Sequence, residues 1–222
     1  MRASTTISLV AAIAAGLGLR ALAAEKVLSN LHGDVSYLAN ATGEAHVLAP
    51  AASTTLSDDD VAKTGDRSMG AIVLPDSSRV ILASDTTIKV DAFNQVDASA
   101  HFVVAQGKLR FTIEHPQGAR ANYTFTTPTG NISVRGTVGD ISVDALDGVR
   151  VNVYQLSQPD LPVAVTMIDG QTFTVAAGQK LWMRWQSGAL VGKVQPLTQG
   201  EIDRFSELGP PPGPPPPSDS PY

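Results

Sequence analysis

The chain contains no cysteine among its 222 residues, and only 5% of them are aromatic. Without cysteine the protein has no disulfide, no thiolate ligand for zinc or an iron–sulfur cluster, and no thiol nucleophile. Positive charge is also scarce, because 16 Lys and Arg face 21 Asp and Glu, for a formal net charge of -5. This balance argues against general nucleic-acid binding, which needs clustered Lys and Arg to displace counterions from the phosphate backbone.

The first 23 residues have the pattern of an export signal. Arg2 precedes the apolar stretch Ile7–Leu19, and residues 21–23 (Ala-Leu-Ala) form a small-residue cleavage site. The apolar stretch is shorter than the roughly 20 residues of a spanning helix, and Arg20 ends it. We therefore expect cleavage before Ala24, no integral membrane span after cleavage, and a periplasmic or secreted protein.

From Val27 onward the chain reads as short strands separated by turn residues. Val, Ile and Thr are frequent, and Val149, Val151 and Val153 alternate with polar residues, as in a strand with one buried face. Strands are expected at Val27–Leu31, Val35–Leu38, Ala71–Leu74, Arg79–Leu82, Val149–Val153 and Gln171–Val175. Their spacing of about 8–12 residues predicts one all-β domain over residues 24–195.

Turn residues separate several of these strands. The pairs Asp147-Gly148 and Asp169-Gly170 are typical of hairpins with type I′ turns. Pro75–Ser78 has the composition of a turn between two strands. Two longer stretches are predicted to be irregular: Asn40–Asp60, which ends in a solvated acidic turn, and the connecting loop Gln155–Pro162.

The C-terminal part changes character. Thr198 and Glu201 fit a capping box, and Ile202, Phe205 and Leu208 follow at roughly helical spacing. We expect a short helix over residues 196–209 that docks its apolar side on the β domain. Residues 210–222 are rich in proline, which predicts a disordered tail that builds no core.

Motifs for catalysis and cofactor binding are missing from the sequence. His32, His46, His101 and His115 show no metal-ligand spacing. No G-x-S-x-G nucleophile turn and no glycine-rich phosphate loop occur. The sequence therefore predicts no catalytic residue, no cofactor and no metal. A hydrolase with two carboxylates far apart in the chain is the enzymatic alternative.

The segment from Leu181 to Trp185 offers a candidate contact surface. Strand alternation places Leu181, Met183 and Trp185 on one face. Trp182 and Arg184 then lie on the other face, so each face holds one tryptophan. An exposed Trp beside Arg is typical of a binding patch. More often, such a Trp is covered by the docked helix, which here would be the C-terminal one.

Several stretches of this sequence resemble the FecR family. They are Thr64–Leu82 (TGDRSMGAIVLPDSSRVIL), Asp85–Val90 (DTTIKV), Gln106–Phe111 (QGKLRF), Phe125–Thr137 (FTTPTGNISVRGT) and Val175–Gln179 (VAAGQ). Phe125–Thr137 is the most specific of them, because it is similar to the family pattern F-x-T-P-x-A-x-x-x-V-R-G-T. The resemblance covers roughly Val27 to Trp185.

The resemblance implies a periplasmic all-β module of stacked short strands, solenoid-like or a twisted β-sandwich, with the C-terminal helix as a cap. Within the V-R-G-T piece, Gly136 permits a tight bend, and Arg135 either fixes the fold or contacts a partner. Founding members also carry a sigma-factor-binding segment, a transmembrane helix and a receptor-docking domain. We expect this chain to lack these parts, so iron signalling is not transferred to it.

The expected function is that of an exported, non-catalytic module for binding, sensing or signalling in the bacterial cell envelope. Its candidate contact residues are Trp182, Arg184 and Arg135. The partner is an unknown envelope protein or a polysaccharide. The alternative is a structural or polysaccharide-binding surface protein.

Overall fold

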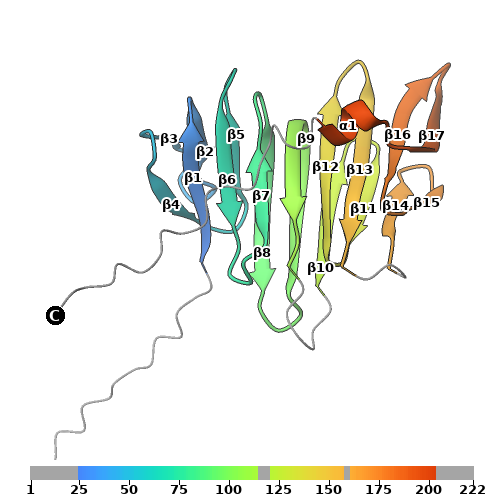
Figure 1. Cartoon of the computed structure of the whole chain (residues 1–222). Coiled ribbons are helices and arrows are strands. Elements are labelled where there is room, and N and C mark those ends of the chain that lie inside the picture. The colour runs from blue at the N-terminus through green and yellow to red at the C-terminus, as the bar shows by residue number, and fades with distance from the viewer. Residues whose placement is uncertain (1–24, 115–120, 158–160, 204–222) are drawn as a thin grey trace, which may run out of the picture.

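Strands of the protein lie side by side in two layers. The structure, a computed structural model, describes residues 25–114, 121–157 and 161–203. Its strands follow one another roughly in chain order, from β1–β4 at one end to β14–β17 at the other (Figure 1). Hydrogen bonding divides them into two layers, here called sheet A and sheet B, which β9 (Ser99–Thr112) joins because it belongs to both.

Sheet A is antiparallel throughout. In spatial order it consists of β4 (Ser53–Leu56), β1 (Lys26–His32), β6 (Met69–Val73), β7 (Arg79–Leu82), the second half of β9, β12 (Thr137–Asp144), β13 (Gly148–Leu156), β16 (Gln179–Gln186) and β17 (Ala189–Pro196).

Sheet B is antiparallel except where β9 and β10 run parallel. It consists of β3 (Ala45–Leu48), β2 (Val35–Leu38), β5 (Asp60–Thr64), β8 (Thr87–Asn94), the first half of β9, β10 (Asn122–Thr127), β11 (Gly130–Val134), β14 (Val163–Met167) and β15 (Thr172–Val175).

The core lies between the two sheets and follows strand alternation. Val149, Val151 and Val153 are buried, as their period of two predicts. In the middle of the core, the Phe102 and Phe125 rings stack with centroids 5.0 Å apart. The expected all-β fold of stacked short strands is confirmed. Its two packed layers match the sandwich, while the progression in chain order is the solenoid-like feature.

The C-terminal helix is present and short. Helix α1 spans Gln199–Asp203, inside the range predicted for it. Residues 204–209, the predicted tail at 210–222 and the predicted signal at 1–23 lie outside the described residues. Within the part of the chain that is described, no helix has both the length and the apolar character to cross a membrane.

The prediction of an irregular loop over Asn40–Asp60 is wrong. This stretch contains the edge strands β3 and β4, and β5 begins at Asp60. Each edge strand buries a single leucine, Leu48 or Leu56, and exposes most of its other residues. Such a strand shows little alternation of polar and apolar residues, so its sequence looks like a loop.

The acidic turn at the end of that stretch is also less solvated than predicted. The Asp60 side chain is buried and accepts hydrogen bonds from the backbone N–H groups of Asn40 and Ser57, each at 2.8 Å. Because a buried carboxylate needs such donors, Asp60 fastens the chain before β3 to the start of β5.

Both Asp-Gly hairpins form, but not with the type I′ turns that we predicted. Asp144 pairs with Gly148 across a three-residue loop, and only the glycine has positive φ (84°). The Asp144 carboxylate accepts the N–H groups of Leu146 and Asp147, which closes the loop. Gly170 likewise ends its loop at φ 88°, without positive φ at the preceding residue. A three-residue loop that ends in a left-handed glycine, as at Gly170, is the next commonest hairpin type.

The crossing of β9 from sheet B to sheet A occurs at Gly107. This residue has φ 96°, which favours glycine. A Cβ atom built on Gly107 would lie 2.4 Å from Thr86 Cα. The Thr86 hydroxyl, in turn, bonds the Lys108 carbonyl (2.9 Å) and accepts the Lys108 N–H (3.1 Å). The close backbone approach at Gly107 therefore locks the bend of β9 against the β7–β8 connection.

We expect Gly107→Ala to destabilise the fold more than Gly170→Ala. Both substitutions place alanine at positive φ, at a cost of about 1–3 kcal/mol. Gly170 has open space around it, whereas at Gly107 the clash adds a further ~1–3 kcal/mol. Urea unfolding of the two variants measures this difference. Equal losses of stability in the two variants would show that the crossing of β9 does not depend on the absence of a Cβ atom at Gly107.

Candidate functional site

The outward face of β16 carries the residues that the sequence singled out. Leu181 and Met183 point into the core and are fully buried. Trp182 and Arg184 alternate with them and therefore lie on the outer face of sheet A. The structure thus brings these two predicted contact residues together.

Contacts from the neighbouring hairpin hold Trp182 in place. Its indole Nε1–H donates to the Asp147 carbonyl oxygen at 2.8 Å. The Arg184 guanidinium carbon lies 3.9 Å from the centre of the Trp182 ring, within cation–π range. Among the described residues Arg184 forms no ion pair. Its donors are therefore oriented by the ring and open to an external carboxylate or phosphate.

Helix α1 contacts the same face of β16 at Lys180. The Lys180 ammonium group donates to both carboxylate oxygens of Glu201, at 2.7 and 2.8 Å. Glu201 Oε2 also accepts the Thr198 N–H at 2.8 Å, which is one half of the predicted capping box. The hydrogen bond and the cation–π contact of Trp182 are with Asp147 and Arg184, whereas the helix forms its ion pair with Lys180, two residues before the tryptophan.

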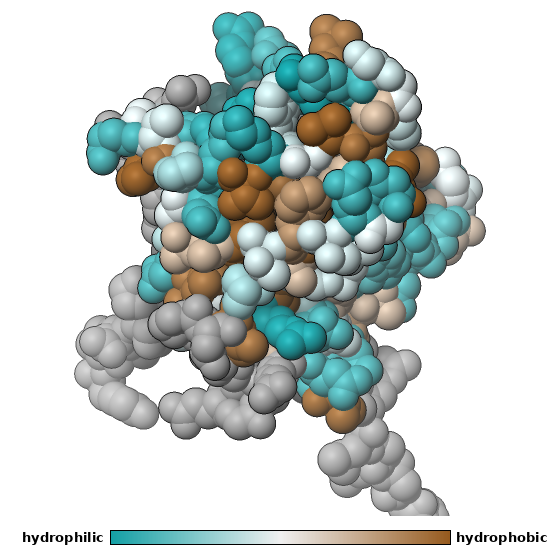
Figure 2. All heavy atoms as spheres, turned by 90° about the vertical axis from the view of Figure 1, so that its right-hand side faces the viewer, coloured by the Kyte–Doolittle hydropathy of each residue, from teal (hydrophilic) through white to brown (hydrophobic). Residues whose placement is uncertain are grey.

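Trp185 is more exposed than predicted. We expected it to share the buried face with Leu181 and Met183, but 59% of Trp185 is exposed. Pairing of β16 with β13 ends where Met183 meets Val149, so Trp185 extends past Gly148, the first residue of β13. Figure 2, which faces the end formed by β15 and β17, shows apolar side chains at this end among polar ones.

Arg135 belongs to a different part of the surface. It is exposed and immediately precedes Gly136 (φ 84°) at the bend between β11 and β12. Trp182 pairs with Arg150, and Arg150 pairs with Ser142. Ser142 lies five residues after the first residue of β12. At about 3.3 Å per strand residue, roughly 16 Å separate the two levels of the sheet. Arg135 and Trp182 therefore do not form one site.

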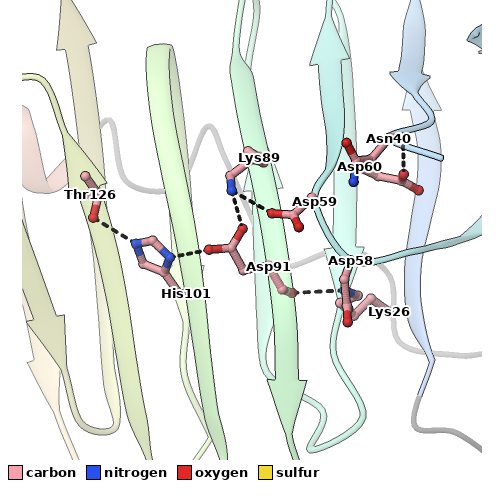
Figure 3. A network of polar contacts seen from close by, with 9 residues as sticks. All are labelled: Lys26, Asn40, Asp58, Asp59, Asp60, Lys89, Asp91, His101 and Thr126. Atoms are coloured by element: carbon pink, nitrogen blue, oxygen red, sulfur yellow. Dashed lines mark hydrogen bonds and ion pairs between the residues drawn. The ribbon is translucent and has the colours of Figure 1, made fainter. Parts of the chain in front are cut away.

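A polar network that the sequence did not predict crosses the outer face of sheet B (Figure 3). Lys89 bridges Asp59 and Asp91, with N–O distances of 2.7 and 2.6 Å. Asp91 bonds His101 Nδ1, and His101 Nε2 lies 2.8 Å from the Thr126 hydroxyl. Lys26 bonds Asp58 and, at 2.9 Å, the Asp91 carbonyl oxygen. The network ties β1, β8, β9, β10 and the loop before β5 together.

Asp91, His101 and Thr126 follow one another as the acid, base and hydroxyl of a catalytic triad do, but the hydroxyl proton is not directed at the histidine. The Thr126 hydroxyl donates to Asn131 Oδ1 at 2.7 Å. Because its proton is directed at Asn131, the hydroxyl is not arranged to give that proton to His101. Burial raises the pKa of Asp91, but hydrogen bonds from Lys89 and His101 outweigh it and hold the pKa below its usual range.

Metal-ligating residues are dispersed. Across the described ranges, no group of three His, Asp or Glu side chains is placed to hold a metal ion. His32, His46 and His101 lie on separate strands, and His115 lies outside the described residues.

A buried ion pair lies on the outer face of sheet A. Arg110 Nε lies 2.9 Å from Asp140 Oδ1, and both side chains are 3% exposed. The Tyr154 hydroxyl donates to Asp140 Oδ2 at 2.9 Å. Burial and the negative charge of Asp140 raise the pKa of Tyr154 to about 12. The pair therefore links β9 and β12, and the tyrosine adds β13.

These features define a two-layer all-β module whose candidate contact residues lie on its outward faces. Residues 60–155 match the family described as FecR protein. The resemblance seen in the sequence is therefore confirmed over these residues, which extend from β5 to β13.

Two crystal structures of "a putative anti-sigma factor from Parabacteroides distasonis ATCC 8503" are similar to the chain, each with 15% sequence identity and a TM-score of 0.49. Each match covers 60% of this chain and 58% of the other chain, so the chain spans less than two thirds of these structures. No curated protein matches it.

We expect the Glu201 carboxyl to titrate at about pH 2. Burial raises the pKa of Glu201, but hydrogen bonds from Lys180 and Thr198 outweigh burial and lower the pKa to about 2, from a usual value of 4.5. Because the folded pKa is depressed, the stabilisation is complete above about pH 4.5 and is lost as the pH falls toward 2. Carbon-13 NMR titration of the side-chain carboxyl measures the midpoint.

The matched variant is Lys180→Met, which removes the main donor. Its Glu201 midpoint should move up toward 4.5. An unchanged midpoint in Lys180→Met, or a wild-type midpoint near 4.5, contradicts the attachment of α1 to β16.

Asp140→Asn should destabilise the protein by about 3–5 kcal/mol, because it leaves the buried Arg110 charge without its counter-charge. The control is Asp66→Asn. Asp66 pairs with Arg67 where both side chains are largely exposed, so its loss should cost no more than about 1 kcal/mol. Chemical unfolding of both variants gives the comparison, and similar losses would argue that Arg110 is not buried.

Proposed function

We propose that the chain is an exported, non-catalytic FecR module that binds a partner in the bacterial cell envelope and acts in sensing or signalling. The observation that carries this proposal is the FecR match over residues 60–155, which includes the strand shared by both sheets. FecR domains occur in the periplasmic region of envelope proteins. Residues 1–23 also support export, because a positive charge is followed by an apolar stretch and then by small residues, as in a signal peptide.

The arrangement of polar groups supports a binding role over catalysis. In the described structure the strongest candidate for a reactive centre, Asp91–His101–Thr126, has its hydroxyl proton committed to Asn131. Trp182 and Arg184 are instead held in fixed positions on an open face. Preorganised side chains on a rigid strand favour recognition, because little conformational entropy is lost on binding.

Export is tested by fractionating cells that produce the full chain. The exported product should have the mass of residues 24–222, whereas an Ala23→Phe variant should keep residues 1–23 because the large side chain blocks the cleavage site. A wild-type chain that stays in the cytoplasm, or is exported with residues 1–23 attached, would overturn the proposed export.

Signalling is tested by the transcripts that change when the gene is deleted. We expect a set of envelope transcripts to change, to be restored by the wild-type chain, and not to be restored by Trp182→Ala/Arg184→Gln. The matched control is Thr172→Ala/Thr174→Ala, which alters exposed residues of sheet B at the same end of the molecule and should restore the transcripts. An unchanged transcript profile in the deletion strain would argue against a signalling role.

A further inference from the structure

Basic side chains form a straight row across the outer face of sheet A. Lys108 of β9 pairs with Ser142 of β12, and Ser142 pairs with Arg150 of β13. Arg150 pairs with Trp182 of β16, which pairs with Lys193 of β17. These five residues therefore lie at one level of the sheet. We call them, together with Arg184, the basic row.

The cations of the basic row occupy every second strand. Neighbouring strands are about 4.8 Å apart, so about 9.6 Å separate Lys108 from Arg150, and the same distance separates Arg150 from Lys193. Arg184 adds a fourth cation beside Trp182. Within the described residues none of the four cations forms an ion pair.

This concentration of positive charge is unusual in a chain with a formal net charge of -5. The acids that border the basic row are Asp144 and Asp147 in the β12–β13 loop and Asp85, which lines the same hollow as Lys108. Backbone N–H groups of that loop bond the Asp144 carboxylate and lower its pKa. Four cations against three acids leave this face positive, and open cations at fixed spacing attract an anionic polymer.

A hollow of about 450 Å³ adjoins the basic row at Lys108. Its lining includes Ser84, Gln106 and Ser142, which offer hydroxyl and amide groups, and the carboxylates of Asp85 and Asp144. Such groups hydrogen-bond sugar hydroxyls, whereas the neighbouring Lys108 suits a carboxylate. The hollow has the volume of a small ligand site, so it has room for one sugar unit of a chain.

We propose that the basic row binds a linear acidic polysaccharide whose carboxylates recur along the chain, and that Arg184, fixed by Trp182, provides the bidentate contact to one of them. The proposal rests on the proposed function, because it names the partner chemistry of the Trp182 site. Single-stranded nucleic acid is disfavoured because it needs open aromatic faces for base stacking. Arg184 already covers the Trp182 ring.

The test measures binding of the purified full-chain product to polygalacturonate by calorimetry at low and moderate salt. Fully methyl-esterified polygalacturonate is the uncharged control with the same backbone. We expect binding of the acid form alone, weakened by salt as surface charges are screened. Lys108→Gln/Arg150→Gln/Lys193→Gln should reduce the affinity at least tenfold, and Trp182→Ala should reduce it about as much as Arg184→Gln.

The matched variant is Lys63→Gln/Arg67→Gln/Arg79→Gln, which removes the same charge from residues outside the basic row that are exposed or half-buried. It should bind within twofold of the wild type. The proposal is overturned by equal losses in both triple variants, by no binding of the acid form, or by tighter binding to polyglutamate, a DNA oligomer or anionic lipid vesicles. These measurements use purified protein, so their failure is distinct from failed export or an unchanged transcript profile.

Discussion

The two-layer architecture depends on the passage of β9 from sheet B to sheet A at Gly107. Before this residue β9 pairs with β8 and β10, and after it the same strand pairs with β7 and β12. The crossing also sets the core, because Phe102 precedes it and Phe111 follows it. Both rings meet Phe125, with centroid distances of 5.0 and 5.3 Å. A single bend therefore fixes both the hydrogen-bond register and the aromatic centre of the fold.

The register set by β9 places different charged groups on the two outer faces. Sheet A carries the basic row and the buried Arg110–Asp140 pair. Sheet B carries the network around Asp91 and His101, and it continues toward β15 with small hydroxyl residues such as Thr166 and Thr172. Charges on sheet B largely satisfy one another, whereas those of the basic row do not. The face with open cations is the one on which an external anion gains most.

Local patterns predicted most of the fold, because alternation and turn residues act over a few residues. Strands β2 and β7 match their predicted ranges. The edge strands β3 and β4 were missed because each buries one leucine. For the candidate site, Trp182 and Arg184 are two residues apart, so alternation alone predicts that they share one face. Lys108 and Lys193 share a level of the sheet only through the pairing of β9 with β12 and of β13 with β16. That long-range register leaves no local signal, and the same holds for His101 and Thr126.

The same alternation explains how such a module can keep its fold while its ligand changes. Trp182 lies between Leu181 and Met183, which are fully buried, so the core uses one set of positions and the surface uses the other. An outward substitution leaves the packing between the sheets intact, and an inward one alters it. The FecR match identifies the fold, but the ligand depends on outward residues, which no fold resemblance determines. In this chain those residues are four open cations, one of them held over a tryptophan, on the outer face of an otherwise acidic protein.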